Sequence, residues 1–137
     1  MTLKKLLLLQ LTYCLLGISY NIVSYNFLQS TGQALTTTPP VIGFFAMMIY
    51  GLFLIPALLE RVFIYKCLMC IAIIVYGYGG IVVHALNYAK EPTLYFSVSS
   101  LIAGIGINII GLALNFYAVL CIKHGSSPFT ETKNSLS

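Results

Sequence analysis

Charged side chains are scarce in this sequence, and their scarcity excludes an ordinary soluble domain. Only 7% of the 137 residues are charged and 59% are hydrophobic, whereas about a quarter of a typical soluble domain is charged. The seven basic and three acidic side chains are too few to coat a soluble fold of this length. The mean hydropathy of +0.94 agrees. The composition therefore predicts one compact membrane domain.

Several functional signatures are also missing. The long apolar stretches hold no acidic residue, which argues against a cation-coupled transporter that uses a buried carboxylate. The basic residues are scattered, so no basic patch predicts a nucleic-acid partner. No serine–histidine–carboxylate set and no glycine-rich phosphate loop is present. We therefore predict no catalytic residue and no metal site, and an enzyme of this kind would have to borrow a cofactor or a catalytic partner.

What the sequence does contain is four uncharged apolar stretches, each long enough to cross a bilayer. About 20 apolar residues span the hydrocarbon core, and a helix satisfies its own backbone hydrogen bonds there. The predicted fold class is an all-α integral membrane protein, a four-transmembrane-helix antiparallel bundle. One membrane domain covers residues 1–123, and a disordered cytoplasmic tail covers 124–137. The predicted spans are about 6–28, 41–59, 67–89 and 94–122.

The positions of the basic residues predict the orientation of these spans. Loops on the cytoplasmic side carry an excess of lysine and arginine. With four spans only Lys90 falls on the other side, so both termini are predicted in the cytoplasm and the protein in a cell inner or plasma membrane. The residues sharing the cytoplasmic side are Lys4, Lys5, Arg61, Lys66, Lys123 and Lys133.

A cleavable signal peptide is an alternative interpretation of the N-terminus. Lys4-Lys5 precedes a run of leucines, and Gly32-Gln33-Ala34 resembles a small-residue cleavage site. The apolar run between them is longer than a typical signal-peptide core, which favours a membrane span.

Small and polar residues recur at intervals of three or four along the first, third and fourth spans. This spacing places each set on one helix face. The second span has only a short version, so we expect the other three to share a buried seam and the second to face lipid. The residues are Gln10, Cys14, Gly17, Asn21 and Ser24; Cys70, Gly77, Gly80, His84 and Asn87; and Ser97, Ser100, Gly104, Asn108, Gly111, Asn115 and Ala118.

These stripes have three interpretations. Small residues let membrane helices approach closely, and amides hydrogen-bond between helices, so the stripes are explained by packing alone. Alternatively, Asn21, His84, Asn108 and Asn115 line a polar cavity that holds a neutral or weakly polar ligand. The third interpretation is contact with a larger complex through the same faces.

Three local features carry further hypotheses. His84 is the one histidine inside a span; no cofactor is predicted, but a haem shared with another subunit through His84 stays open. Cys67 and Cys70 form a CxxC pair without two further zinc ligands, which favours structural thiols. The glycine-rich run 76–80 is interpreted as a kink, a close-packing site or a broken transporter helix.

Two functions from different classes follow. The first is a non-enzymatic accessory or assembly subunit that acts by helix–helix association in a membrane complex. The second is a small oligomeric channel or carrier for a neutral or weakly polar ligand. The expected partners are the lipid bilayer and other membrane subunits or further copies of the chain.

Overall fold

All regular secondary structure in the described residues is helical, as the sequence predicts. The computed structural model describes residues 1–123 and 125–129. Four helical segments are long and apolar enough to cross a membrane: Leu3–Thr31, Pro40–Leu58, Val62–Lys90 and Val98–Cys121. The first is α1 (Leu3–Thr31), and the second consists of α2 (Pro40–Leu52) and α3 (Ile55–Leu58). The third runs through α4 (Val62–Ile74), η1 (Val75–Val82) and α5 (Val83–Lys90), and the fourth is α6 (Val98–Cys121).

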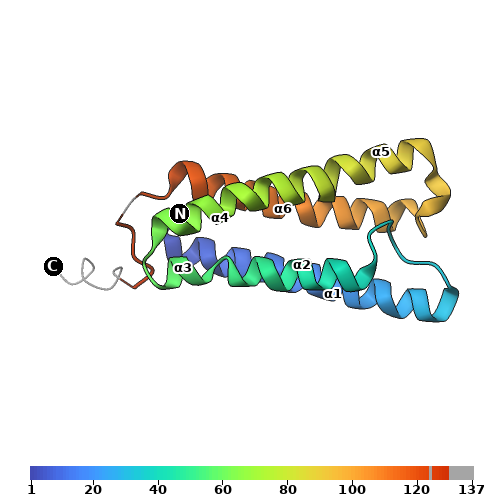
Figure 1. The fold of residues 1–137 in the computed structure, drawn as a ribbon, viewed down its shortest axis with the longest axis horizontal. Helices are drawn as coiled ribbons and strands as arrows, with labels where there is room; N and C mark the ends of the chain where they lie inside the picture. Colours follow the sequence, from blue (N-terminus) through green and yellow to red (C-terminus); the bar gives the residue numbers. More distant parts are fainter. Residues whose placement is uncertain (124, 130–137) are drawn as a thin grey trace.

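The four segments form two helical hairpins that lie side by side (Figure 1). One hairpin joins α1 to α2, and the other joins the α4–α5 helix to α6. In the bundle α1 packs against α2 and α6, and α6 packs against α4 and η1. The amino group of Met1 donates to the Tyr117 hydroxyl at 2.8 Å, so the start of α1 lies beside the end of α6.

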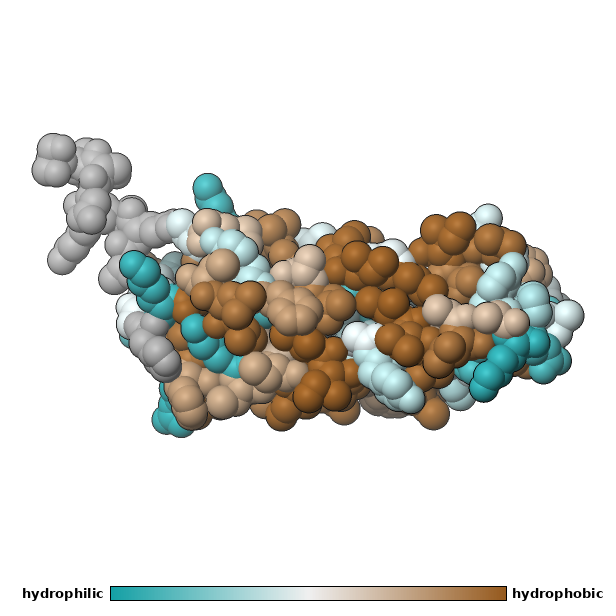
Figure 2. Space-filling view, turned by 90° about the horizontal axis from the view of Figure 1, so that it is seen from above, coloured by the Kyte–Doolittle hydropathy of each residue, from teal (hydrophilic) through white to brown (hydrophobic). Residues whose placement is uncertain are grey.

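The outer surface of the bundle is predominantly apolar. Figure 2 shows a hydrophobic surface along the middle of the molecule, with hydrophilic residues gathered toward its two ends. Large apolar side chains point outward from every long helix, among them Leu15, Ile49, Ile74 and Leu120, the last of these 75% exposed. Water would not cover such a surface without cost, whereas lipid tails would.

Two predicted helix starts are wrong by several residues. The third long helix begins at Val62 rather than at residue 67, because Val62 and Tyr65 are buried and Lys66 extends its ammonium group to the Val119 carbonyl oxygen at 2.9 Å. The fourth begins at Val98 rather than at 94. Ser97 is its N-cap, and Ser97 and Ser100 bond reciprocally to each other's backbone amides, which fixes the first turn there.

Three prolines lie at the beginnings of helical segments. Pro40 opens α2, where its missing amide donor costs nothing. Pro92 opens a single 3₁₀ turn, Pro92–Leu94, ahead of the fourth helix. Pro56 lies in the first turn of α3, directly after the break between α2 and α3.

The glycine-rich run lies in a π-helical segment rather than at a broken helix. η1 covers Val75–Val82 and continues directly from α4 into α5. A π-helical segment inside an α-helix is rare and occurs frequently at functional sites. Its position in the middle of the third span therefore directs attention to the neighbouring helices.

The predicted disordered tail covers residues 124–137, of which 124 and 130–137 lie outside the described residues. Within 125–129, the Ser127 hydroxyl donates to the Glu60 carboxylate, and Pro128 is buried. This short segment therefore packs against the turn between α3 and α4.

Candidate ligand cavity

A cavity of about 220 Å³ lies between the two hairpins. Every long helix contributes to its walls, and so does the loop between α1 and α2. Asn21, His84 and Asn108, three of the four residues predicted to share a polar cavity, line it together. The other lining residues are Gly17, Tyr20, Thr36, Thr38, Gly43, Ala46, Met47, Val75, Tyr76, Gly79, Gly80, Gly104 and Ile107.

The middle of the cavity is built around Asn108 of α6. Its amide nitrogen donates to the carbonyl oxygens of Gly80 at 3.2 Å and Gly104 at 3.0 Å. A Cβ atom on Gly80 would lie 2.5 Å from the Asn108 Cγ atom, so the glycine makes the space that the amide occupies. The π-helical segment and α6 are thereby joined through a side chain and a glycine backbone.

Asn21 of α1 is held in a similar way against α2. Its amide nitrogen donates to the Gly17 carbonyl oxygen at 2.8 Å. Its amide oxygen lies against Gly43, where a Cβ atom would meet it at 2.0 Å. Asn21 also borders a second, apolar cavity of about 230 Å³ on the outside of α1 and α2. It therefore lies at the boundary between the interhelical cavity and the outer surface.

His84 closes the end of the cavity nearest the two loops. It is 7% exposed and surrounded by hydroxyl groups. Its Nδ1 atom lies 2.9 Å from the Tyr95 hydroxyl and 3.3 Å from that of Thr37, and its Nε2 atom lies 3.1 Å from the Thr38 hydroxyl. Both ring nitrogens are therefore engaged, and a bond from either one to haem iron would displace a hydroxyl partner.

The loop threonines reach His84 because the loop is tied to two helices. The Leu35 amide donates to the Ser24 hydroxyl at 3.1 Å, and the Leu35 carbonyl accepts from the Ser100 hydroxyl at 2.8 Å. Leu35 and Thr36 are both buried. The polar sequence that follows α1 is thus more than a surface link, because it covers one end of the cavity.

The lining of the cavity includes residues on the outer face of η1. Val75 lines the cavity and is nevertheless 52% exposed, and Gly79 one turn further on is also exposed. Gly43 and Ala46 of α2 line the cavity as well. η1 packs against α6, whereas α2 packs against α1, so these two parts of the lining belong to different hairpins.

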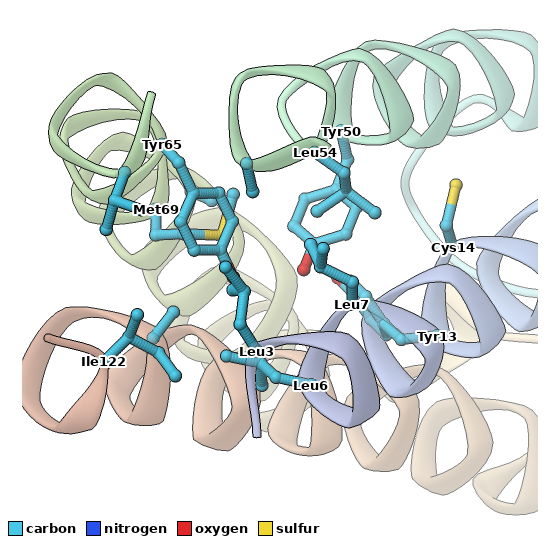
Figure 3. Close-up of a cluster of buried hydrophobic side chains, with 14 of the residues drawn as sticks. Leu3, Leu6, Leu7, Tyr13, Cys14, Tyr50, Leu54, Tyr65, Met69 and Ile122 are labelled. Atoms are coloured by element: carbon cyan, nitrogen blue, oxygen red, sulfur yellow. The ribbon is translucent and has the colours of Figure 1, made fainter. Parts of the chain in front are cut away.

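Asn115, the fourth predicted cavity residue, lies in a separate cluster toward the chain termini. We call Gln10, Tyr50, Tyr65, Met69 and Asn115 the four-helix polar cluster, because each long helix contributes to it. All five residues are fully buried, at 0% exposure. Figure 3 shows Tyr50, Tyr65 and Met69 projecting from α2 and α4 toward α1.

Hydrogen bonds connect the members of the four-helix polar cluster to one another. The Tyr65 hydroxyl donates to Gln10 Oε1 at 2.6 Å, and the Tyr50 hydroxyl donates to Asn115 Oδ1 at 2.7 Å. Gln10 Nε2 donates to Asn115 Oδ1 and to the Met69 sulfur, both at 3.1 Å. Asn115 Nδ2 has no partner among the described residues. This arrangement joins four helices and leaves little polar capacity for a ligand.

The predicted seam is wrong in its choice of helices. The first span packs against the second, and the first and third spans lie diagonally across the bundle, linked by the bond between Gln10 and Tyr65. Tyr50 and Ala57 of the second span are 0% exposed. Tyr50 belongs to the short stripe of the second span, and its hydroxyl donates to Asn115, so the second span takes part in the buried polar contacts after all.

The sequence also gave no indication of several lining groups. Tyr20 and Tyr76 read as ordinary apolar bulk, but their hydroxyls donate to the Ser100 carbonyl at 2.7 Å and the Ala46 carbonyl at 2.6 Å. Thr36 and Thr38 read as part of a polar link. The tyrosine spacing of three and four residues from Gly17 and Gly80 is the one signal that could have placed those rings on the same faces.

The thiols take no part in the cavity. Cys14 is buried and its thiol donates to the Met47 carbonyl oxygen at 3.1 Å, whereas Cys67, Cys70 and Cys121 are exposed and free. Among the described residues, no three histidine, cysteine or acidic side chains gather where they could hold a metal ion.

Comparison with known proteins adds no relative to this description. No family model, no curated protein and no solved structure matches the chain. The functional argument therefore depends on the geometry of the cavity itself.

Proposed function

We propose that this chain is a four-span membrane protein that takes a small, uncharged amphiphile from the bilayer into its interhelical cavity. Four apolar helices and the outward-facing apolar side chains support insertion in a membrane. Lys4, Arg61 and Lys123 lie at one end of the bundle and Lys90 at the other, which supports a cytoplasmic location of both termini.

The single observation that carries the proposal is the cavity of about 220 Å³, whose lining includes two amides, a histidine and the exposed residues Val75 and Gly79. A dry cavity of roughly 150 Å³ already holds benzene. Typical drug-sized sites begin near 300 Å³. The space therefore suits a polar head group with a few carbons, while a longer tail remains in the lipid outside Val75 and Gly79.

The four-helix polar cluster favours a binding protein or carrier over a channel. Its buried side chains fill the bundle between the cavity and the terminal end. A single chain therefore offers a site between its helices whose lining includes the exposed residues Val75 and Gly79. Passage across the membrane would require either a second conformation or several copies.

Photolabelling in lipid nanodiscs tests the proposal. The probes are eight-carbon diazirines of matched length that carry an alcohol, a methyl ether or a ketone head group. We expect at least one probe to label residues that line the cavity. Ala46→Phe and Ile107→Phe, which fill the cavity from different helices, should reduce that labelling at least tenfold.

Ala85→Phe, at an exposed position of α5, is the matched control and should leave labelling unchanged. The unfolding midpoint of each variant shows whether it is folded. The proposal fails if no probe labels the cavity, or if folded cavity-filling variants are labelled like the unsubstituted protein.

Helix–helix association, as in an accessory or assembly subunit, is a second candidate function with its own observation. A Cβ atom on Gly106 would meet nothing within 4 Å, and Ala103 and Ala113 on the same face of α6 are exposed. Small residues on an outer membrane-helix face permit close approach of another helix.

Purification from the native membrane in a mild detergent tests this second candidate. A partner protein, or a second copy of the chain, should accompany the unsubstituted protein and be lost with Gly106→Leu. Ala85→Leu is the control on another helix. A chain that purifies alone in every case would contradict the association.

A further inference from the structure

The polar groups that line the cavity differ in kind, and the difference points to a ligand class. Resting on the proposed function, we propose that the cavity selects a neutral amphiphile whose head group donates a hydrogen bond, an alcohol in preference to an ether or ketone of the same size. The reason is that most side-chain donors in the walls are committed within the protein, whereas several acceptors are not.

Most amide and phenol donors are used on backbone carbonyls. Asn108 uses both of its amide hydrogens, on Gly80 and Gly104, and Asn21 uses one of its two, on Gly17. The two lining phenols, Tyr20 and Tyr76, donate to Ser100 and Ala46. Redirecting any of these donors to a ligand would leave a buried carbonyl oxygen without its partner, which is unfavourable.

His84 is also committed, and we infer from its contacts which nitrogen carries the proton. The Tyr95 hydroxyl has one hydrogen and lies 3.0 Å from the His84 carbonyl oxygen, which can only accept. We therefore assign the donor role to the Nδ1 atom, 2.9 Å from the same hydroxyl. Nε2 is then the acceptor, and Thr38 gives it its hydroxyl hydrogen at 3.1 Å. The ring has no N–H left for the cavity.

The acceptors are less occupied. Asn108 Oδ1 receives one long contact, 3.4 Å from the Tyr13 hydroxyl. Asn21 Oδ1 and Thr38 Oγ1 receive no side-chain or backbone hydrogen bond from the described residues, and the Asn21 oxygen lies against Gly43. Each of these three oxygens can accept a hydrogen bond from a ligand hydroxyl.

Two lining donors have no acceptor among the described residues: the second amide hydrogen of Asn21, and the hydroxyl of Thr36 at the loop end of the cavity. Next to Asn21 and Asn108, more acceptors than donors are left without a partner within the protein. A carbonyl or ether head group would bring a further acceptor to that wall. An ammonium group would donate, but it would enter an apolar surrounding without a carboxylate among the lining residues.

The three matched diazirine probes test this selectivity in the same nanodiscs. We expect the alcohol to label the Asn21–Asn108 wall at about one tenth of the concentration that the methyl ether and the ketone require. Asn108→Leu and Asn21→Leu remove one acceptor each and should bring the alcohol's half-saturating concentration close to that of the ether. Ether labelling serves as the internal control, because it should persist in both variants.

Each outcome distinguishes this inference from the proposed function beneath it. Equal labelling by all three probes, or a preference for the ketone, would overturn the donor selectivity and leave the cavity as a binding site. Loss of ether labelling together with alcohol labelling in both variants would also overturn it, because the two asparagines would then only shape the cavity. An absence of cavity labelling by every probe would overturn the proposed function itself.

Discussion

The two halves of the bundle use the same kinds of polar residue in opposite ways. In the four-helix polar cluster, Gln10 and Asn115 bond to each other and to tyrosines from the remaining helices. Around the cavity, Asn21 and Asn108 return their amide hydrogens to backbone carbonyls, two of them on their own helices. In the first half, hydrogen bonds between fully buried side chains link all four long helices. In the second half, a cavity remains between the two hairpins.

This difference teaches that amides at helical spacing do not by themselves distinguish packing from binding. What distinguishes them is the identity of their partners. Where the two amides bond to each other and to tyrosines, both of their oxygens accept hydrogen bonds within the cluster and little space remains between the helices. Where the amides bond to backbone carbonyls, only their nitrogens are used, so their oxygens and the volume beside them stay available.

The largest effect is expected from a substitution in the four-helix polar cluster. Gln10→Leu removes three contacts and leaves the Tyr65 hydroxyl buried without an acceptor. We expect the free energy of unfolding to fall by about 2 kcal/mol, measured by sodium dodecyl sulfate titration in mixed micelles with far-ultraviolet circular dichroism. Gln29→Leu, at an exposed position of α1, is the matched control. If both variants unfold at the same detergent fraction, the cluster does not stabilise the bundle.

The second prediction concerns a glycine that lines the cavity. Gly80→Ala drives a methyl group into the space of the Asn108 amide, which two carbonyls hold in place. We expect alcohol-probe labelling to weaken about tenfold and unfolding to become easier by roughly 1 kcal/mol, because the displaced amide enters the cavity. Gly106→Ala is the control, since its Cβ atom meets nothing within 4 Å. Equal labelling of the two variants would contradict the role given to Gly80.

Asn115 sharpens the comparison within the four-helix polar cluster. Asn115→Leu removes two hydrogen bonds, but it also removes a buried amide nitrogen that has no partner among the described residues. We therefore expect a loss of about 1 kcal/mol, smaller than for Gln10→Leu, with probe labelling unchanged because Asn115 does not line the cavity. A loss equal to or larger than that of Gln10→Leu would indicate that Asn115 Nδ2 is engaged in the folded protein.

The sequence predicts the parts of this fold that depend on composition and period. The four helices follow from long apolar stretches, and the grouping of Asn21, His84 and Asn108 follows from residues repeating every three or four positions. The π-helical segment does not follow, because Gly77, Gly79 and Gly80 are compatible with several backbone conformations. The place of the second span depends on Tyr50, whose hydroxyl is a small polar group on a large apolar ring, and the start of the third depends on how far Lys66 can reach.

The smallest expected effect concerns His84 Nε2, the ring nitrogen at the cavity that contacts the hydroxyl of Thr38 in the loop between α1 and α2. Thr38→Val keeps the size of the side chain and removes the hydroxyl that donates to His84 Nε2. That nitrogen then becomes an acceptor beside the cavity, while the Thr38 oxygen, another acceptor, is lost. A ring nitrogen is the stronger base of the two, so we expect the alcohol probe to bind about threefold more tightly and the methyl ether to bind as before. Thr12→Val, on an exposed position of α1, is the matched control. Weaker alcohol binding in Thr38→Val would mean that the threonine oxygen, rather than the histidine, receives the ligand's hydrogen, and the donor preference would then depend on the loop between the first two helices.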